Sequence, residues 1–324
     1  PIWRDTFRDA VKEAGFEEVE NVPSMYFRSK DKPPCELEPG RRERPGEPLI
    51  PWPEDRPVGD IYLRIPDYPL PTGDVSMSTH VDDPLIMVES DEDELWAHRQ
   101  INARFGTKGI NRLTVDNQID YLSIILQLDI DGTLFLHNRE KIEKYLLEAG
   151  LQFCKKSKTP LDKATLAAIQ CNKEASNFLT EDEATVYRGH IGKFLWLANT
   201  THPGLSTYVS LLSHFNAHPP VGCVEATPKI YRFLQWAKDW GIGKKVGNWD
   251  GIRFDSDADW AGMYAITGDV RSRSGAIGLH NGMPFIWNTK WQDCRANDYS
   301  ETACIATSTG QAETYAVADA CKLA

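Results

Sequence analysis

Two adjacent carboxylates, Asp82 and Asp83, lie in the segment from Met77 to Val88, whose pattern predicts a strand, a tight turn and a second strand. Mg²⁺ prefers oxygen ligands, and carboxylates held on a rigid hairpin can bind it. Two such ions can stabilise the attacking and leaving oxygens of a phosphoryl or nucleotidyl transfer. The pair alone is a weak signal, because adjacent Asp residues are commonest in solvated turns.

A second group of carboxylates follows a short predicted strand in the C-terminal part, in the run SDADWAG at 256–262. Alternate residues of a strand share a face, so we expect Asp255, Asp257 and Asp259 to point the same way. Three carboxylates on one face repel one another unless they bind a cation or lie in solvent. From the residues alone, a metal site and a solvated acidic strand end both remain open.

Glu313 is a third candidate, on a helix that we predict from Gln311 to the end of the chain. A single helical Glu is usually a surface residue, and it gains interest only if its helix packs beside the strand that bears Asp257. Among the histidines, His80 lies beside the acidic pair, but no metal-ligand spacing is present. The sequence also contains no Gly-rich phosphate loop, Ser-His-Asp arrangement or HExxH motif.

Short helices and strands must position these carboxylates. Apolar residues at helical spacing, followed by Gly15, predict a helix over 3–14. The other predicted elements are a strand at 26–27, a helix at 97–105, strands at 121–128 and 133–136 around an Asp131-Gly132 turn, and helices at 139–149, 185–199, 205–215 and 223–240. Short strands at 252–254, 275–279 and 284–287 follow, with a hairpin turn at Asn281-Gly282.

The window from Pro33 to Pro71 differs from the rest of the chain in composition, because it holds eleven of the twenty prolines. Each proline removes a backbone donor and fixes φ, so neither helix nor sheet can persist there. We predict an extended loop or insertion; the alternative is a ligand for a partner domain that binds Pro-rich strands.

The 324 residues suggest two domains, and a hydrophobic content of 41% excludes wholesale disorder. The net charge of −11 argues against a simple nucleic-acid-binding module, which should be basic. The charge is uneven, however: residues 151–250 hold 12 basic and 8 acidic groups, or +4, and the rest of the chain is acidic. Any binding of nucleic acid should therefore involve mainly this segment, and its affinity should fall as the salt concentration rises.

The seven cysteines are widely spaced and form no zinc or redox motif, which favours reduced thiols in a reducing, intracellular compartment, cytoplasmic or nuclear. No apolar run is long enough to span a membrane. The chain opens at Pro1 without an initiator Met and closes inside a predicted helix, so we expect a piece of a longer polypeptide.

Taken in order, the motifs resemble the polyprotein of Ty1/copia-type LTR retrotransposons. The Thr-His-Val-Asp-Asp segment at 79–83 resembles the Tyr-x-Asp-Asp box of a polymerase palm, and 121–124 resembles the Leu-Gly-Ile strand that follows it. The run at 256–262 resembles the family's Ser-Asp-Ala-Asp-Trp-Ala-Gly motif. Other matches, in family order, are Trp3 with Gly15-Phe16, Thr159-Pro160-Leu161, Tyr187-Arg188, Ile191-Gly192, 195–198, Thr201-His202-Pro203, 271–275, Ile286-Trp287 and Ala312-Glu313.

This resemblance implies an α+β chain, with a partial reverse-transcriptase palm and helical thumb/connection followed by a truncated RNase H-like α/β fold. The implied parts are the palm in 1–32 and 73–150, an insertion in 33–72, the thumb and connection in 151–245, and the N-terminal part of RNase H in 246–324.

The implied activities are RNA-directed DNA synthesis and cleavage of the RNA strand of a hybrid, both with two Mg²⁺ ions. Asp82 and Asp83 would be catalytic metal ligands of the polymerase, and Asp257 and Glu313 the first two ligands of the RNase H site. The implied partners are an RNA template, a DNA primer, an RNA–DNA hybrid and a dNTP substrate, with no membrane.

The chain also departs from the family pattern. His80 stands where the family has Tyr, and Gly204 where it has Asp. The resemblance further calls for a third palm Asp upstream and for later RNase H acids that we do not find. We therefore expect both sites to be incomplete and the isolated chain to be inactive. The alternative is a degenerate or co-opted remnant that acts as a structural or interaction protein.

Overall fold

The computed structural model describes residues 2–20, 24–31, 73–81, 83–105, 107, 109–245, 251–268, 270–292 and 306–323. The Pro-rich window at 33–72 and Asp82 lie outside the described residues, so the structure does not test the predictions made for them. The chain divides into two compact units, Pro1–Asn111 and Arg112–Ala324.

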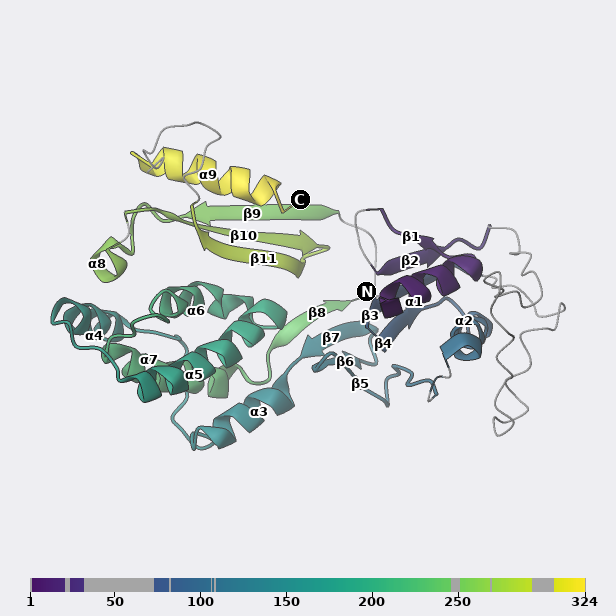
Figure 1. The fold of residues 1–324 in the computed structure, drawn as a ribbon, viewed down its shortest axis with the longest axis horizontal. Coiled ribbons are helices and arrows are strands. Elements are labelled where there is room, and N and C mark those ends of the chain that lie inside the picture. The colour runs from purple at the N-terminus through teal and green to yellow at the C-terminus, as the bar shows by residue number, and fades with distance from the viewer. Residues whose placement is uncertain are drawn as a thin grey trace. The chain divides into compact units, whose positions relative to one another are not determined.

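The first unit combines an antiparallel sheet in the order β1-β2-β3-β4 with two helices (Figure 1). Its elements are α1 (Ile2–Glu13), β1 (Glu17–Glu18), β2 (Met25–Arg28), β3 (Val75–His80), β4 (Asp83–Met87) and α2 (Asp91–Phe105). The core contains Phe7 and Val11 of α1, Tyr26 and Met77 of the sheet, and Trp96 of α2. The sequence-predicted helix at 3–14 and the hairpin between Met77 and Val88 are both confirmed.

The second unit begins with a four-stranded antiparallel sheet in the order β5-β6-β7-β8. Its strands are β5 (Ile119–Tyr121), β6 (Ile124–Leu128), β7 (Thr133–His137) and β8 (Gly241–Lys245). The prediction of one strand over 121–128 is wrong. Leu122 and Ser123 have φ of 54° and 65° and form a turn that separates β5 from β6.

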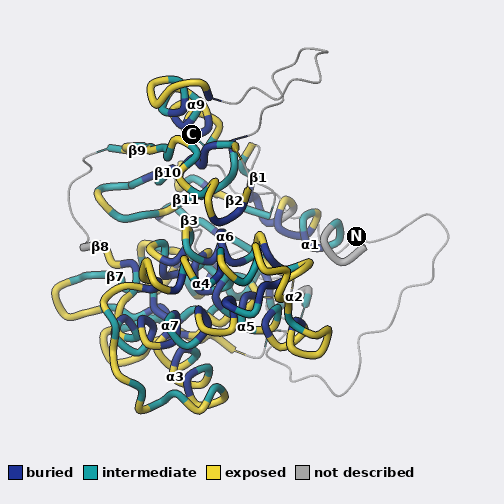
Figure 2. The backbone as a smooth tube through the Cα atoms, turned by 90° about the vertical axis from the view of Figure 1, so that its left-hand side faces the viewer, coloured by how far each residue is buried: buried dark blue, intermediate teal, exposed yellow. Residues whose placement is uncertain are grey.

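Helices form the middle of this unit, and Figure 2 shows their buried faces in dark blue. They are α3 (Arg139–Glu148), α4 (Lys163–Glu174), α5 (Glu181–Thr200), a 3₁₀ turn at Pro203–Leu205, α6 (Ser206–Ser213) and α7 (Gly222–Ala237). One apolar core joins them, with Ile142 of α3, Ile169 of α4, Phe194 of α5, Leu212 of α6 and Leu234 of α7.

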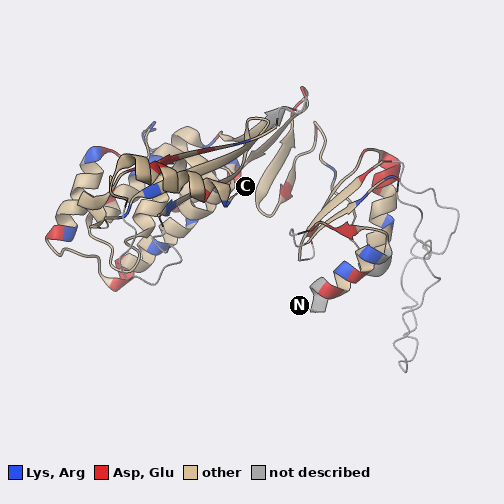
Figure 3. Cartoon of the chain, turned by 90° about the horizontal axis from the view of Figure 1, so that it is seen from above, with Lys and Arg blue, Asp and Glu red and all other residues tan. Residues whose placement is uncertain are grey.

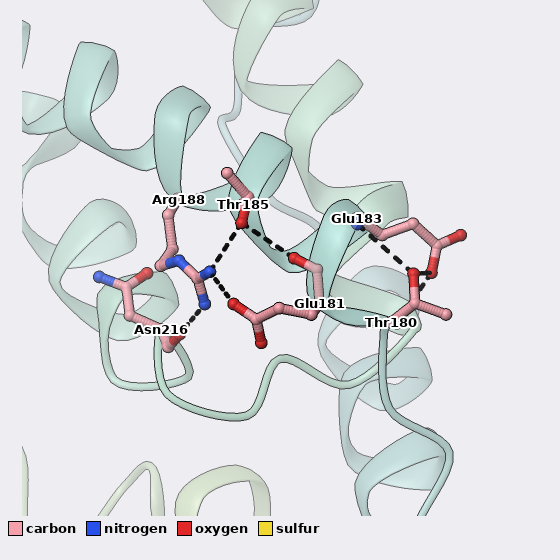
Figure 4. A network of polar contacts seen from close by, with 6 residues as sticks. All are labelled: Thr180, Glu181, Glu183, Thr185, Arg188 and Asn216. Carbon is pink, nitrogen blue, oxygen red and sulfur yellow. Dashed lines mark hydrogen bonds and ion pairs between the residues drawn. The ribbon is translucent and has the colours of Figure 1, made fainter.

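Helix α5 begins four residues before its predicted start because Thr180 and Glu183 form a reciprocal capping box. The Glu183 side chain accepts from the Thr180 backbone at 2.9 Å, and the Glu183 N–H donates to Thr180 Oγ1 at 3.4 Å (Figure 4). One turn later, the Arg188 guanidinium contacts Glu181 at 2.5 Å and donates to Thr185 Oγ1 at 2.9 Å. These contacts satisfy donors at the start of the longest helix of the described residues.

The C-terminal part is a three-stranded antiparallel sheet in the order β11-β10-β9, followed by helix α9. Its elements are β9 (Ile252–Ala258), α8 (Tyr264–Thr267), β10 (Arg273–His280), β11 (Met283–Trp291) and α9 (Thr309–Cys321). The predicted hairpin at Asn281-Gly282 is confirmed, and both residues have positive φ. Helix α9 packs against β9 and β10 (Figure 1).

Two further predictions concern membranes and cysteines. Among the described residues, no helix has the length and apolar character needed to cross a membrane. The described cysteines Cys154, Cys171, Cys223 and Cys321 are free thiols.

Candidate functional site

The β3–β4 hairpin presents Asp83, one of the first two candidate carboxylates, at its tip. Asp83 is exposed and is the first residue of β4, directly opposite His80 of β3. Val81, between them, has φ of 55°, which gives the tight reversal that the sequence predicts. Asp82 lies outside the described residues. Since β3 is paired on both sides, the hairpin is anchored in the sheet, with buried Val75 and Met77 below its tip.

Asp257 lies near the end of β9, and its side chain is exposed. Residues 253, 255 and 257 alternate with less exposed neighbours, and Arg253 pairs with Asp255 at 2.9 Å. Asp255 and Asp257 therefore share one face, as the sequence predicts. The residue opposite Asp257 on β10 is Gly275, which offers it no side chain.

The prediction that Asp259 points with these two carboxylates is wrong, because β9 ends at Ala258. One oxygen of Asp259 accepts the backbone N–H of Arg273 at 2.6 Å, and the backbone N–H of Asp259 donates to the Arg273 carbonyl at 3.1 Å. Asp259 thus fastens the end of β9 to the start of β10.

Glu313 lies in the second turn of α9, whose N-cap Ser308 accepts from the Gln311 N–H at 3.2 Å. Its neighbour Ala312 is fully buried, and Glu313 itself is half-buried. Helix α9 packs on β9, the strand that bears Asp257, and on β10. Glu313 therefore remains a candidate site residue.

The two faces of the C-terminal sheet have different neighbours. Gln292 donates to Ser274 Oγ and to the Ala312 carbonyl, so Ser274 marks the face that α9 covers. Ser274 pairs with Ala258 in the register, whereas Asp257 pairs with Gly275. Strand alternation therefore places the Asp257 side chain on the face opposite to the one that α9 covers.

The described carboxylates do not fit a Mg²⁺ ion by themselves. Within the described part of the chain, no group of three or more His, Cys, Asp or Glu side chains lies close enough to hold a metal ion. A hard cation needs several oxygen ligands, and one exposed carboxylate supplies too few. No step of a reaction follows from the described carboxylates alone.

A buried polar network joins the helices to the β5–β8 sheet. Thr201 Oγ1 lies 2.8 Å from the Asn138 amide and 2.8 Å from His202 Nδ1, and His202 Nε2 donates to the Ala237 carbonyl at 3.2 Å. Burial lowers the pKa of His202 from its usual 6.5, because the imidazolium form is disfavoured there. His202 lies in the short connection between α5 and the 3₁₀ turn at Pro203–Leu205 that leads into α6.

The positive middle segment exposes four lysines near the start of α4. Lys155, Lys156 and Lys158 lie in the loop before α4, and Lys163 is the first residue of α4. Figure 3 shows the Lys and Arg residues of the chain in blue. Other lysines of this segment are in ion pairs, as with Lys193 and Glu148 at 2.7 Å.

The structure also reveals Arg273, which the sequence analysis did not single out. Its side chain is buried, and Trp291 lies opposite it on β11. The spacing of Arg271 and Arg273, two residues apart at the start of β10, was the available signal, but such spacing does not reveal burial.

Comparisons with known proteins place the chain among mobile elements. No family model matches it, and no solved structure matches it significantly. It is 23% identical over 292 residues to a Ty5-1 transposon protein of Saccharomyces cerevisiae, covering 89% of this chain and 76% of that protein.

Two Arabidopsis thaliana proteins are also similar, both named retrovirus-related Pol polyproteins. The one from transposon RE1 is 28% identical over 221 residues, or 67% of this chain, and the one from transposon RE2 is 36% identical over 110 residues, or 34% of this chain. The chain spans only 14% and 7% of the lengths of these polyproteins. The order of motifs and these relatives together make the chain similar to Ty1/copia-type LTR retrotransposon polyproteins.

Proposed function

We propose that the chain is the later part of a retrotransposon reverse transcriptase joined to the start of its RNase H. The observation that carries this proposal is the similarity to transposon and Pol proteins over most of the chain. Two structural features support it. Asp83 falls at a hairpin tip in a four-stranded sheet, and Asp257 falls on the first strand of a three-stranded sheet that leads into α9.

In this proposal Asp82 and Asp83 are ligands of the polymerase, and Asp257 and Glu313 are ligands of the RNase H. When bound, Mg²⁺ would stabilise the attacking and leaving oxygens of the transferred phosphoryl group. The described carboxylates do not assemble a site on their own. We therefore propose that the isolated chain neither extends a primer nor cleaves a hybrid, and that further acidic ligands must come from outside the described residues.

The proposed partners are an RNA template, a DNA primer and their hybrid, with dNTPs as substrate. Residues 151–250 carry the +4 charge, and the exposed lysines before α4 are available to contact phosphates. Contacts of this kind release counterions, so their affinity falls as salt rises. Because the rest of the chain is acidic on balance, we expect this segment to contribute most of the long-range attraction to phosphates.

Fluorescence anisotropy with an RNA–DNA hybrid at several salt concentrations tests this function. The Lys155, Lys156 and Lys158 to Gln triple variant should bind more weakly, with a salt slope reduced by about 2–3. A Lys12, Lys30 and Lys322 to Gln variant removes the same charge elsewhere and should keep the slope. Equal losses in both variants, or no hybrid binding by the unaltered chain, would overturn the proposal.

A further inference from the structure

Arg273 carries a buried guanidinium group that has no hydrogen-bond partner among the described residues. It is the first residue of β10 and is 4% exposed. Its Nε, Nη1 and Nη2 atoms are all buried, and none has a hydrogen-bond partner in the described part of the chain. Arg stays protonated in proteins, so the charge persists, and a buried charge without a partner is strongly unfavourable.

The surroundings of Arg273 are basic and aromatic. Trp291 lies directly opposite it on β11, with the ring centroid 4.8 Å from Arg273 Cζ. The same ring lies 5.7 Å from Arg271 Cζ, and the His214 ring, at the end of α6, lies 5.8 Å from it. Two guanidinium groups and an imidazole thus surround one indole. We call Arg271, Arg273, His214 and Trp291 the Trp291 cluster.

Asp259 is the nearby acidic residue, but it leaves the guanidinium N–H groups unsatisfied. Its carboxylate accepts the backbone N–H of Arg273 instead. The attraction of Asp259 raises the pKa of Arg273 less than burial lowers it. The side chain therefore has a fixed charge and unused donors, and neither is matched within the described residues.

We propose that the Trp291 cluster is a binding site for a phosphate group, with Arg273 as its main ligand. A guanidinium presents parallel N–H donors that match two oxygens of a phosphate, and Arg271 supplies a second positive charge for a multiply charged ion. A carboxylate, with one charge and two oxygens, matches two guanidinium groups less well. The indole covers Arg273, so phosphate binding displaces the Trp291 ring.

Thermal unfolding in inorganic phosphate, against chloride at equal ionic strength, tests the site. Ligand that binds only the folded state raises the melting temperature, here by about 3 °C once phosphate is in roughly tenfold excess over its dissociation constant. The Arg273→Met variant should lose this shift and should melt above the unaltered chain in chloride. The Arg253→Met variant, which alters an exposed arginine of β9, should keep the full shift.

Two results would overturn the proposal. An equal phosphate shift in Arg273→Met and in the unaltered chain would indicate general salt stabilisation. No phosphate shift in the unaltered chain, together with a lower melting temperature for Arg273→Met in chloride, would show that Arg273 only packs on Trp291. Arg273→Lys keeps the charge with fewer donors, so a smaller but measurable shift is expected even if the Met variant folds poorly.

A second experiment, which measures binding of an RNA–DNA hybrid, distinguishes a strand phosphate from free phosphate as the ligand. If the ligand is a strand phosphate, the hybrid should bind the unaltered chain several-fold more tightly than Arg273→Met. Equal binding to both would assign the site to free phosphate. The melting experiment with inorganic phosphate involves no nucleic acid. Its result therefore tests the phosphate site independently of the proposed polymerase and RNase H function.

Discussion

Asp257 and Asp259 lie two residues apart in one motif, but the structure gives them different roles. Asp257 is exposed and faces a glycine across the sheet, whereas Asp259 accepts a backbone N–H of β10. The motif indicates that both positions are Asp. Only the position at which β9 ends shows that Asp259, and not Asp257, forms a structural hydrogen bond.

We predict that Asp259→Ala lowers the free energy of unfolding by about 1–2 kcal/mol, because the Arg273 N–H loses its acceptor. Asp257→Ala should stay within about 0.5 kcal/mol, as for other exposed positions. Urea unfolding of both variants measures the difference. Equal losses would contradict the separation of roles.

His202 predicts a pH dependence of stability. Burial lowers the pKa of His202 in the folded chain below the ordinary value of 6.5, which applies to the unfolded chain. At pH values between these two pKa values, the unfolded chain therefore binds more protons than the folded chain. Stability is therefore full above about pH 6.5 and falls as the pH drops below it. Burial also lowers the pKa values of His137 and His190, which add slopes of the same sign.

The His202→Gln variant should lose up to about 1.4 kcal/mol per pH unit of this slope between pH 6.5 and the folded pKa. Urea unfolding at pH 5, 6 and 7 measures it, with the exposed His218→Gln as control. A slope that His202→Gln leaves unchanged would show that the buried imidazole is not the group that titrates.

At the scale of elements, local patterns predicted most helices and hairpins. Apolar spacing with a terminal glycine gave α1, and Asn281-Gly282 gave the β10–β11 turn. The sequence did not predict β8, because its pairing with β7 joins residues about a hundred positions apart. Such a pairing depends on how the intervening helices fold and leaves no local signal.

Two glycines test this difference between local and long-range structure. A Cβ at Gly241 would lie within 2.2 Å of the Leu136 carbonyl, so Gly241→Ala should disrupt β7–β8 pairing and cost more than about 1 kcal/mol. A Cβ at Gly192, on the exposed side of α5, meets nothing, so Gly192→Ala should add roughly 0.5–1 kcal/mol. Urea unfolding measures the change in the free energy of unfolding for both variants. Changes of the same sign would contradict either the β7–β8 register or the exposed helical position of Gly192.

At the scale of the molecule, the sequence predicted the family, the mixed helices and strands, and the location of positive charge. The packing of α9 beside the strand that bears Asp257 was only a condition in the sequence reasoning, and the structure meets that condition. The sequence did not predict on which side of the sheet each group lies, because that follows from register. The divisions at residues 150 and 245, and the assignment of palm, thumb and RNase H, stay predictions.

The central proposal is that this chain contains parts of a polymerase site and of an RNase H site. Its described carboxylates do not assemble a metal site by themselves. The most direct test is Mg²⁺-dependent extension of a DNA primer on an RNA template, comparing the unaltered chain with Asp82→Asn/Asp83→Asn. We predict that the unaltered chain binds the hybrid but, like the double variant, extends no primer. Extension by the unaltered chain that the double variant loses would contradict the account.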